Sequence, residues 1–194
     1  MGPSTRTPMR ERLLEAATDL FYLQGLRAVS VDKVIDAAGT TKVTFYRHFK
    51  SKDDLIVAYL EGRAALERAG IGAALARGNG DVGATLELMA EQVGLAACMS
   101  GFRGCPFINA AAEYPDPASP VRRAVAAHRQ WCRAAFEQLV APLGRKGSDE
   151  VVDSLMLLRD GAMVSGYLDE PAAVAGAFLR GVRAVIGTTV AETR

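Results

Sequence analysis

The chain has 194 residues, 49% of them hydrophobic, which is enough for one domain or two small ones with a buried core. No apolar run is as long as a membrane span, and the first residues lack the hydrophobic segment of a secretory signal. We therefore expect a cytoplasmic protein without a membrane partner. The net charge is +1, but residues 1–52 carry nine Lys or Arg against five Asp or Glu, whereas residues 53–194 carry fourteen against seventeen. The basic N-terminal quarter favours an anionic partner.

Two short helices are predicted first. Apolar residues recur on one helical face over residues 10–24, and Gly25 follows where a helix end favours a positive φ. Ser30 can cap a second helix over residues 31–38, which Gly39 ends.

A third helix is predicted to open at Thr40 or Thr41 and to end near Phe49. Ser51, followed three residues later by an aspartate, resembles a capping box that starts a fourth helix around Lys52.

Beyond Gly70, glycine and proline punctuation predicts longer helices. These are a helix over residues 82–99, a short one with Pro106 in its first turn, a long one starting at Pro120 after a Ser119 cap, one capped by Ser148, and a last one starting at residues 169–171. No alternating strand pattern and no internal repeat is present. The sequence thus predicts an all-α fold of roughly nine helices.

The stretch TTKVTFYRHFKSK, residues 40–52, combines four cations, a histidine and three aromatics with no acid. Phe45 and Phe49 are four residues apart and share one helical face, so we expect them to pack inward. The opposite face then presents Val43, Thr44, Tyr46 and Arg47, with Lys42 at its N-terminal end.

Two short helices followed by a turn and a basic third helix match a helix-turn-helix, whose recognition helix enters the major groove of DNA. Lys52, His48, Tyr46 and the backbone N–H groups behind Ser30 can reach phosphates, and the outward face of the third helix can reach base edges. A basic face that is merely solvated is the alternative. The predicted DNA-contacting set is Ser30, Thr41, Lys42, Val43, Thr44, Tyr46, Arg47, His48 and Lys52.

The segment AAGTTKVTFYRHFKSKDDL, residues 37–55, resembles the signature of TetR-type transcriptional regulators, and the similarity extends over about residues 10–56. The resemblance implies that Tyr46, His48 and Lys52 meet DNA phosphates. It also implies a helical C-terminal domain that binds an effector, dimerises through its last two helices and usually represses transcription. Val43 departs from the glycine often found there, which bears on the operator sequence.

Residues 57–194 show no recognisable catalytic constellation, so we expect no enzyme activity and no cofactor. His128 and Cys132 share a helical face that Cys98 and Cys105 could approach, but no tight cysteine pair accompanies them. Buried, reduced cysteines are favoured over a metal site. Cys105, at a predicted helix start, is either an oxidant sensor or an inert packed thiol, and the second interpretation is favoured.

A ligand pocket is predicted on several helices of this region. Periodicity cannot separate a pocket wall from a core wall, and most of these residues would be core in any bundle. The apolar candidates are Met89, Val93, Phe102, Phe107, Tyr114, Trp131, Met156 and Met163, and the polar ones are Asn109, Glu113, His128 and Arg159.

The last two predicted helices carry broad apolar faces that can pack within one chain or against a twin as a four-helix interface. The family resemblance favours the twin. The predicted interface is Val151, Leu155, Leu158, Ala162, Val174, Phe178, Val182, Val185 and Ile186.

Together these features predict a homodimeric repressor that leaves a palindromic operator on double-stranded DNA when an unidentified small molecule binds. Residues 1–52 would form the DNA-binding domain, and residues 53–194 the effector-binding and dimerisation domain. Two alternatives stay open: a dimeric DNA-binding protein without a ligand, whose C-terminal domain recruits a partner, and a helical enzyme that acts on an anionic substrate.

Overall fold

The computed structural model describes residues 7–144 and 148–192, and within these ranges it contains nine α-helices, one 3-10 turn and no strand. The prediction of an all-α fold is confirmed. The elements are α1 (Met9–Gln24), α2 (Val31–Ala38), α3 (Lys42–His48), α4 (Lys52–Gly78), α5 (Val82–Ala97), α6 (Pro106–Glu113), α7 (Pro120–Val140), the 3-10 turn η1 (Ala141–Leu143), α8 (Ser148–Leu168) and α9 (Pro171–Glu192).

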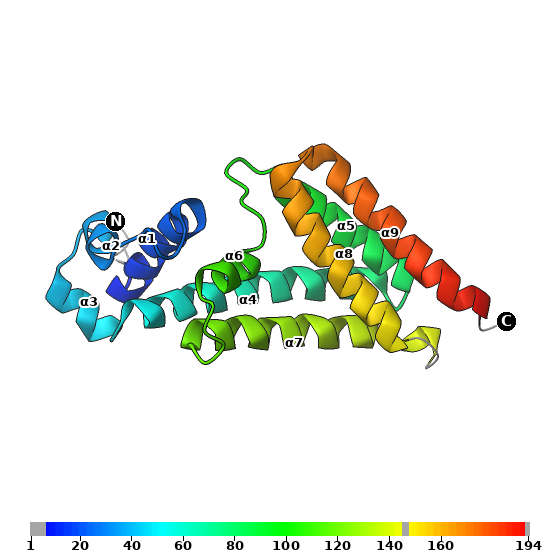
Figure 1. Ribbon diagram of the computed structural model, residues 1–194, viewed down its shortest axis with the longest axis horizontal. Coiled ribbons are helices and arrows are strands. Elements are labelled where there is room, and N and C mark those ends of the chain that lie inside the picture. Colours follow the sequence, from blue (N-terminus) through cyan, green and yellow to red (C-terminus); the bar gives the residue numbers. More distant parts are fainter. Residues whose placement is uncertain (1–6, 145–147, 193–194) are drawn as a thin grey trace, which may run out of the picture.

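The molecule is elongated, with α1, α2 and α3 at one end and α5, α8 and α9 toward the other (Figure 1). Helix α4 runs lengthwise from the first group toward the second, and α7 lies alongside it. None of the helices in the described residues is long and apolar enough to cross a membrane.

Side-chain caps start the helices where the sequence predicts them. The hydroxyl oxygens of Ser30, Ser51 and Ser119 accept hydrogen bonds from backbone N–H groups three residues on, at 3.1, 3.0 and 3.1 Å. Each cap satisfies one of the N–H groups that a helix start leaves without a partner. Helix α8 begins at Ser148, but the side chain of that residue lies outside the described part, so its predicted cap is not tested.

Helix α4 passes through Gly70, where the sequence pattern changes, and continues to Gly78. The backbone oxygen of Gly70 accepts a hydrogen bond from the Gln92 side chain, which joins α4 to α5. At Gly78 a Cβ atom would lie 1.9 Å from the Thr85 hydroxyl oxygen, so this contact requires glycine.

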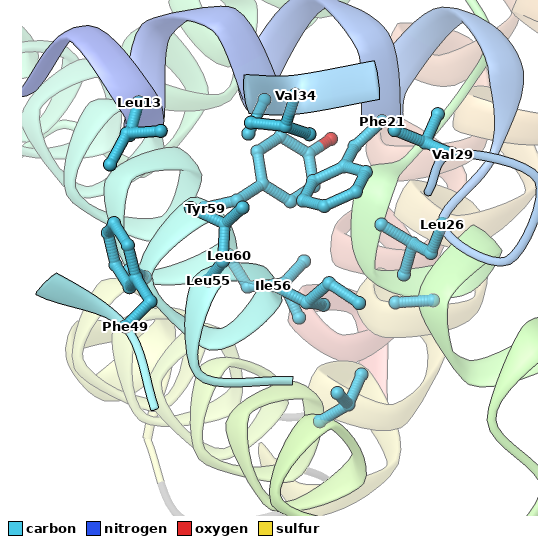
Figure 2. Close-up of a cluster of buried hydrophobic side chains, with 14 of the residues drawn as sticks. Leu13, Phe21, Leu26, Val29, Val34, Phe49, Leu55, Ile56, Tyr59 and Leu60 are labelled. Atoms are coloured by element: carbon cyan, nitrogen blue, oxygen red, sulfur yellow. The ribbon is translucent and has the colours of Figure 1, made fainter. Parts of the chain in front are cut away.

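The N-terminal helices close over one apolar core (Figure 2). It joins Leu13 and Phe21 of α1 and Val34 of α2 to Tyr59 and Leu60 of α4. The predicted inward packing of Phe45 and Phe49 is confirmed, because Phe45 of α3 and Phe49 directly after it are 0% and 3% exposed. The first turns of α4 therefore complete this core, while the predicted domain boundary at residue 52 stays a prediction.

A second core lies between α4, α5, α7, α8 and α9. Helices α8 and α9 pack closely, since a Cβ atom on Gly181 would lie 2.7 Å from a Leu158 methyl. Six of the predicted interface residues are buried in this protomer core: Val151, Leu155, Ala162, Val174, Phe178 and Val182. The other three, Leu158, Val185 and Ile186, are half-buried and pack against it.

Candidate functional site

Helix α3 presents a continuous outward face. Thr41 caps it by accepting a hydrogen bond from the Thr44 N–H at 3.3 Å. Val43 and Tyr46 are 67% and 48% exposed, although large apolar and aromatic side chains are usually covered. With Lys42 and Arg47 these two line a shallow surface hollow, and His48 is also exposed. Thr44 is half-buried beside them.

The other two predicted DNA-contacting residues lie at neighbouring helix starts. Ser30 is exposed at the start of α2, where its hydroxyl caps the helix. Lys52 is half-buried at the start of α4, where its Nζ donates to the backbone oxygen of Arg27 at 3.3 Å. Burial lowers the pKa of Lys52.

A cavity of about 540 Å³ opens between the N-terminal helices and the second core. Of the predicted pocket residues, the structure places six in its wall: Met89, Val93, Phe102, Phe107, Arg159 and Met163. The predominantly apolar wall with few polar groups is typical of a small-molecule site.

The remaining pocket candidates lie elsewhere. The Glu113 carboxylate accepts hydrogen bonds from the N–H groups of Leu26 and Arg27 at 2.9 and 2.7 Å, which ties α6 to the connection after α1. The Asn109 side chain donates to the backbone oxygen of Arg103 at 2.8 Å. The other four are buried or half-buried and do not line the cavity: Tyr114, His128, Trp131 and Met156.

The cavity wall also contains residues of α1 that sequence reasoning missed, namely Asp19, Tyr22 and Leu23. The Tyr22 hydroxyl donates to the backbone oxygen of Gly104 at 3.0 Å and accepts from the Arg103 N–H at 2.9 Å. Helix α1 is thus bonded to the segment that leads into α6. No local signal marks these residues, because their contacts lie about 80 positions away along the chain.

A buried polar cluster joins the inner part of the cavity wall to α7. Arg159 is 6% exposed, and its Nη2 and Nη1 donate to Glu67 Oε1 at 2.5 Å and Asp160 Oδ1 at 3.0 Å. His128 is 1% exposed; its Nε2 lies 3.1 Å from Glu67 Oε2, and its ring stacks on Phe107 at 3.6 Å between centroids. Glu67 was missed because nothing in its neighbourhood on α4 distinguishes it from other surface-type glutamates.

Glu67 and Arg159 stabilise each other's charged forms in this cluster. Burial alone would raise the pKa of Glu67, but the hydrogen bond from His128 and the positive charge of Arg159 outweigh it and lower that pKa to about 2. Burial alone would lower the pKa of the Arg159 guanidinium, yet the negative charge of Glu67 raises it. Burial raises the pKa of the Cys132 thiol to about 12.

Glu67, His128 and Cys132 offer three metal-donor atoms within 4.8 Å of one another. However, Arg159 bonds Glu67, and its Nη2 lies 3.4 Å from His128 Nε2, so a cation there would meet a fixed positive charge. Glu67 instead serves as the partner of this guanidinium and of His128. All three cysteines are free; Cys105 and Cys132 are buried, but the prediction of burial is wrong for Cys98, which is exposed just beyond α5.

Helices α8 and α9 leave an apolar surface outward after the second core is packed. Leu157, Val164 and Leu168 of α8 are 73%, 43% and 69% exposed. On α9, Ala173 and Ala177 are exposed. This surface, rather than the buried set above, is what the protomer leaves available on these two helices.

Comparisons with known proteins agree with this geometry. The model of the family described as bacterial regulatory proteins, tetR family, matches residues 13–59. The crystal structure of SCO4454, a TetR-family transcriptional regulator from Streptomyces coelicolor, is 41% identical over 94% of this chain and 96% of that one, with a TM-score of 0.88.

Two curated relatives match over 56 and 59 residues. The transcriptional activator FasR of Mycolicibacterium smegmatis is 39% identical over 29% of this chain and 26% of its own length. The transcriptional repressor KstR2 of Rhodococcus jostii is 39% identical over 30% and 29%, respectively. This chain therefore spans less than a third of each of these two proteins, one an activator and the other a repressor.

Proposed function

The chain belongs to the TetR family of bacterial regulatory proteins, and we propose that it is a homodimeric transcriptional repressor that leaves a palindromic operator when a small molecule enters the cavity. Residues 1–52 are proposed to bind DNA, and residues 53–194 to bind the effector and dimerise. The proposal assigns no catalytic role to any residue. Because its partner is operator DNA, the protein would act in the cytoplasm.

The exposed face of α3 supports the DNA-binding part. Lys42 and Arg47 can donate to base edges in a major groove, while the Val43 methyl groups can touch a thymine methyl. Lys42 lies 3.6 Å from Asp32, but both side chains are largely exposed, so a phosphate can replace this weak pair.

The outward surface of α8 and α9 supports the dimer. A twofold axis would bring each α8 and α9 against their copies and cover Leu157, Val164 and Leu168. Two α3 helices related by the same axis would read two half-sites of a palindrome.

One observation carries the coupling of ligand to DNA: α1 belongs to the N-terminal core and also forms part of the cavity wall. Leu13 and Phe21 pack beneath α2 and α3, whereas Tyr22 and Leu23 line the cavity. A ligand that fits one placement of α1 better than another would shift the population toward that placement. The two α3 helices would then no longer match successive major grooves.

Selection of binding sites from random duplex DNA, followed by a screen for compounds that release the protein, tests this proposal. We expect an enriched palindrome with half-sites about one helical turn apart and a compound that lowers its occupancy. If no sequence is enriched, the DNA-binding proposal is wrong. If the palindrome is bound but no compound releases the protein, the alternative is favoured, namely a dimeric DNA-binding protein without a ligand whose C-terminal domain recruits a partner.

A further inference from the structure

The inner wall of the cavity contains a guanidinium in an apolar setting. Arg159 is 6% exposed, and the surrounding wall includes Phe107, Phe136 and Met163. Buried arginines are costly unless they are paired, and a guanidinium binds planar carboxylates in preference to other anchors. The guanidinium pairs at present with Glu67 and Asp160.

The outer part of the same cavity is rimmed by apolar side chains that water reaches. Leu23, Leu66 and Met99 all line the cavity, yet they are 47%, 66% and 67% exposed. A single exposed apolar side chain needs no explanation, but three around one opening form a surface that an apolar ligand would cover.

From the buried guanidinium at the inner end of the cavity and the apolar rim at its opening, we propose that the effector is a carboxylic acid with an apolar body. Its carboxylate binds Arg159, and its apolar body extends between Leu23, Leu66 and Met99. This inference deepens the proposed function and rests on it. In the complex the ligand carboxylate takes the place of Glu67 at the Nε and Nη2 edge of Arg159, and Glu67 keeps its contact with His128.

The exchange conserves charge in the buried cluster if the acid enters with its proton. Before binding, Arg159 is paired with Glu67, and His128 Nε2 faces the second Glu67 oxygen at 3.1 Å. After binding, the ligand carboxylate pairs with Arg159, and the acid proton goes to Glu67 Oε1, the oxygen that the guanidinium has left, while Glu67 Oε2 still faces His128 Nε2. No uncompensated charge is left in the interior, which is the condition for a low cost of burial.

His128 keeps its contact with Glu67 throughout this exchange. Its Nε2 faces a carboxylate and therefore carries the ring proton, whereas its Nδ1 is buried without a hydrogen-bond partner among the described residues. The groups around the ring are Glu67 from α4, Phe107 from α6, Cys132 from α7 and Arg159 from α8. Cys132 stays a thiol here, because burial raises its pKa.

Calorimetric titration of the wild-type protein with decanoate, 1-decanol and decylamine tests the class of ligand. Decanoate should bind at least about tenfold more tightly than either of the others, since hydrogen bonds between charged groups are the stronger ones. Titrations at pH 7 in buffers of different ionisation enthalpy should show uptake of about one proton per decanoate, because decanoate is ionised in solution. Equal binding of decanol, or no proton uptake, would overturn the proposal.

Two substitutions separate the partners of the carboxylate. Glu67→Gln removes the competing carboxylate, so decanoate should bind about tenfold more tightly and without proton uptake. Arg159→Lys keeps the charge but loses the paired geometry, so the preference for decanoate over decanol should fall about tenfold. Arg68→Gln, on the exposed side of α4 against Trp131, is the matched control and should leave all three affinities unchanged.

A second arginine, Arg63, also lies in the cavity wall and stacks over the Tyr22 ring at 5.3 Å. If Arg63→Gln removes the preference for decanoate while Arg159→Lys retains it, the anion binds elsewhere and the proposal is wrong.

Release of the operator DNA is measured separately from decanoate binding. Decanoate that binds as described without releasing the operator contradicts the repressor mechanism alone, whereas release by a neutral compound with no decanoate binding contradicts the ligand class alone.

Discussion

Glu67 sets the charge balance of the cavity wall. Its carboxylate contacts Arg159 and His128 at once, and its pKa is lowered to about 2 because these partners outweigh the effect of burial. A carboxyl group whose pKa is lower in the folded state than in the unfolded chain stabilises the fold above its unfolded pKa. That contribution is lost as the pH falls toward the folded value.

The resulting prediction concerns acid stability. Between pH 5.5 and 3.5 the wild-type protein should lose roughly 1 kcal/mol of unfolding free energy through this group, starting from an ordinary unfolded pKa. Glu67→Gln should be less stable at pH 7, and its difference from wild type should shrink over this interval. Chemical denaturation at each pH measures both. A difference that stays constant with pH would contradict the assigned pairing.

Arg47 and Lys52 are expected to make different kinds of DNA contact. Arg47 is exposed on α3, whereas Lys52 is half-buried at the start of α4 and already holds the Arg27 carbonyl. Lys52→Ala should weaken binding to every sequence and reduce the log–log salt slope by about one unit per subunit. Arg47→Ala should relax preference at one symmetric pair of positions, because a bidentate guanine contact provides about 1–3 kcal/mol of discrimination.

Salt titrations and site selection with both variants make this comparison. If Lys52→Ala changes the selected sequence while Arg47→Ala lowers affinity uniformly, the wrong face of α3 has been placed in the groove.

At the level of elements, the short N-terminal helices were predictable because their ends are local chemistry. Ser30 and Ser51 accept hydrogen bonds from N–H groups only three residues away, and Gly25 and Gly39 have positive φ values. Such signals lie within one turn of the boundary they define.

The Ser30 cap gives a prediction that separates stability from DNA contact. Ser30→Ala removes the oxygen that accepts the Lys33 N–H and should lower the unfolding free energy by about 1 kcal/mol while also weakening DNA binding. Ser30→Asp retains a capping oxygen but adds a negative charge near the phosphates, so stability should hold while DNA affinity falls. If Ser30→Asp binds DNA as the wild type does, Ser30 is a cap without a role at the interface.

The partners of the long-helix faces were less predictable, because an apolar residue in the sequence does not indicate whether its own chain or a second copy covers it. Leu155 and Leu157 are two residues apart on α8, yet they are 0% and 73% exposed. The sequence pattern selected Leu155 for the twin interface, whereas that side chain fills the protomer core. Similarly, the cavity brings Tyr22, Glu67 and Arg159 together from distant parts of the chain, and only Arg159 was predicted as a pocket residue.

This difference changes the test of assembly. A charge at Phe178 is expected to unfold the protomer, because that side chain is 3% exposed within one chain. Leu157→Glu should instead give a folded monomer with weak operator binding, because the charge would be buried in the proposed dimer surface. Leu95→Glu, a leucine on α5 with 72% exposure, is the matched control and should remain dimeric. Sedimentation at micromolar concentration measures the oligomeric state of the wild type and of both variants. A monomeric wild-type protein would contradict the proposed dimer.

For the whole molecule, the proposed response to a ligand depends on how rigidly the two ends are joined. Helix α4 contributes Leu60 to the N-terminal core and Ile71 to the second core, so in this proposal a movement at the cavity would be carried along one continuous helix. Contacts of Tyr22 with Gly104 and of Glu113 with Leu26 add a second connection through α6. A dimer built this way would hold its two α3 helices at one fixed spacing until a ligand binds.

That fixed spacing can be measured on the DNA. The wild-type protein is titrated onto the selected palindrome, onto the same duplex with about five base pairs inserted at its centre, and onto a duplex with a single half-site. The insertion is about half a helical turn and rotates one half-site to the opposite side of the duplex. We expect the affinity for the inserted duplex to fall to that for the single half-site. Equal affinity for the original and inserted palindromes would contradict two recognition helices held by a rigid dimer.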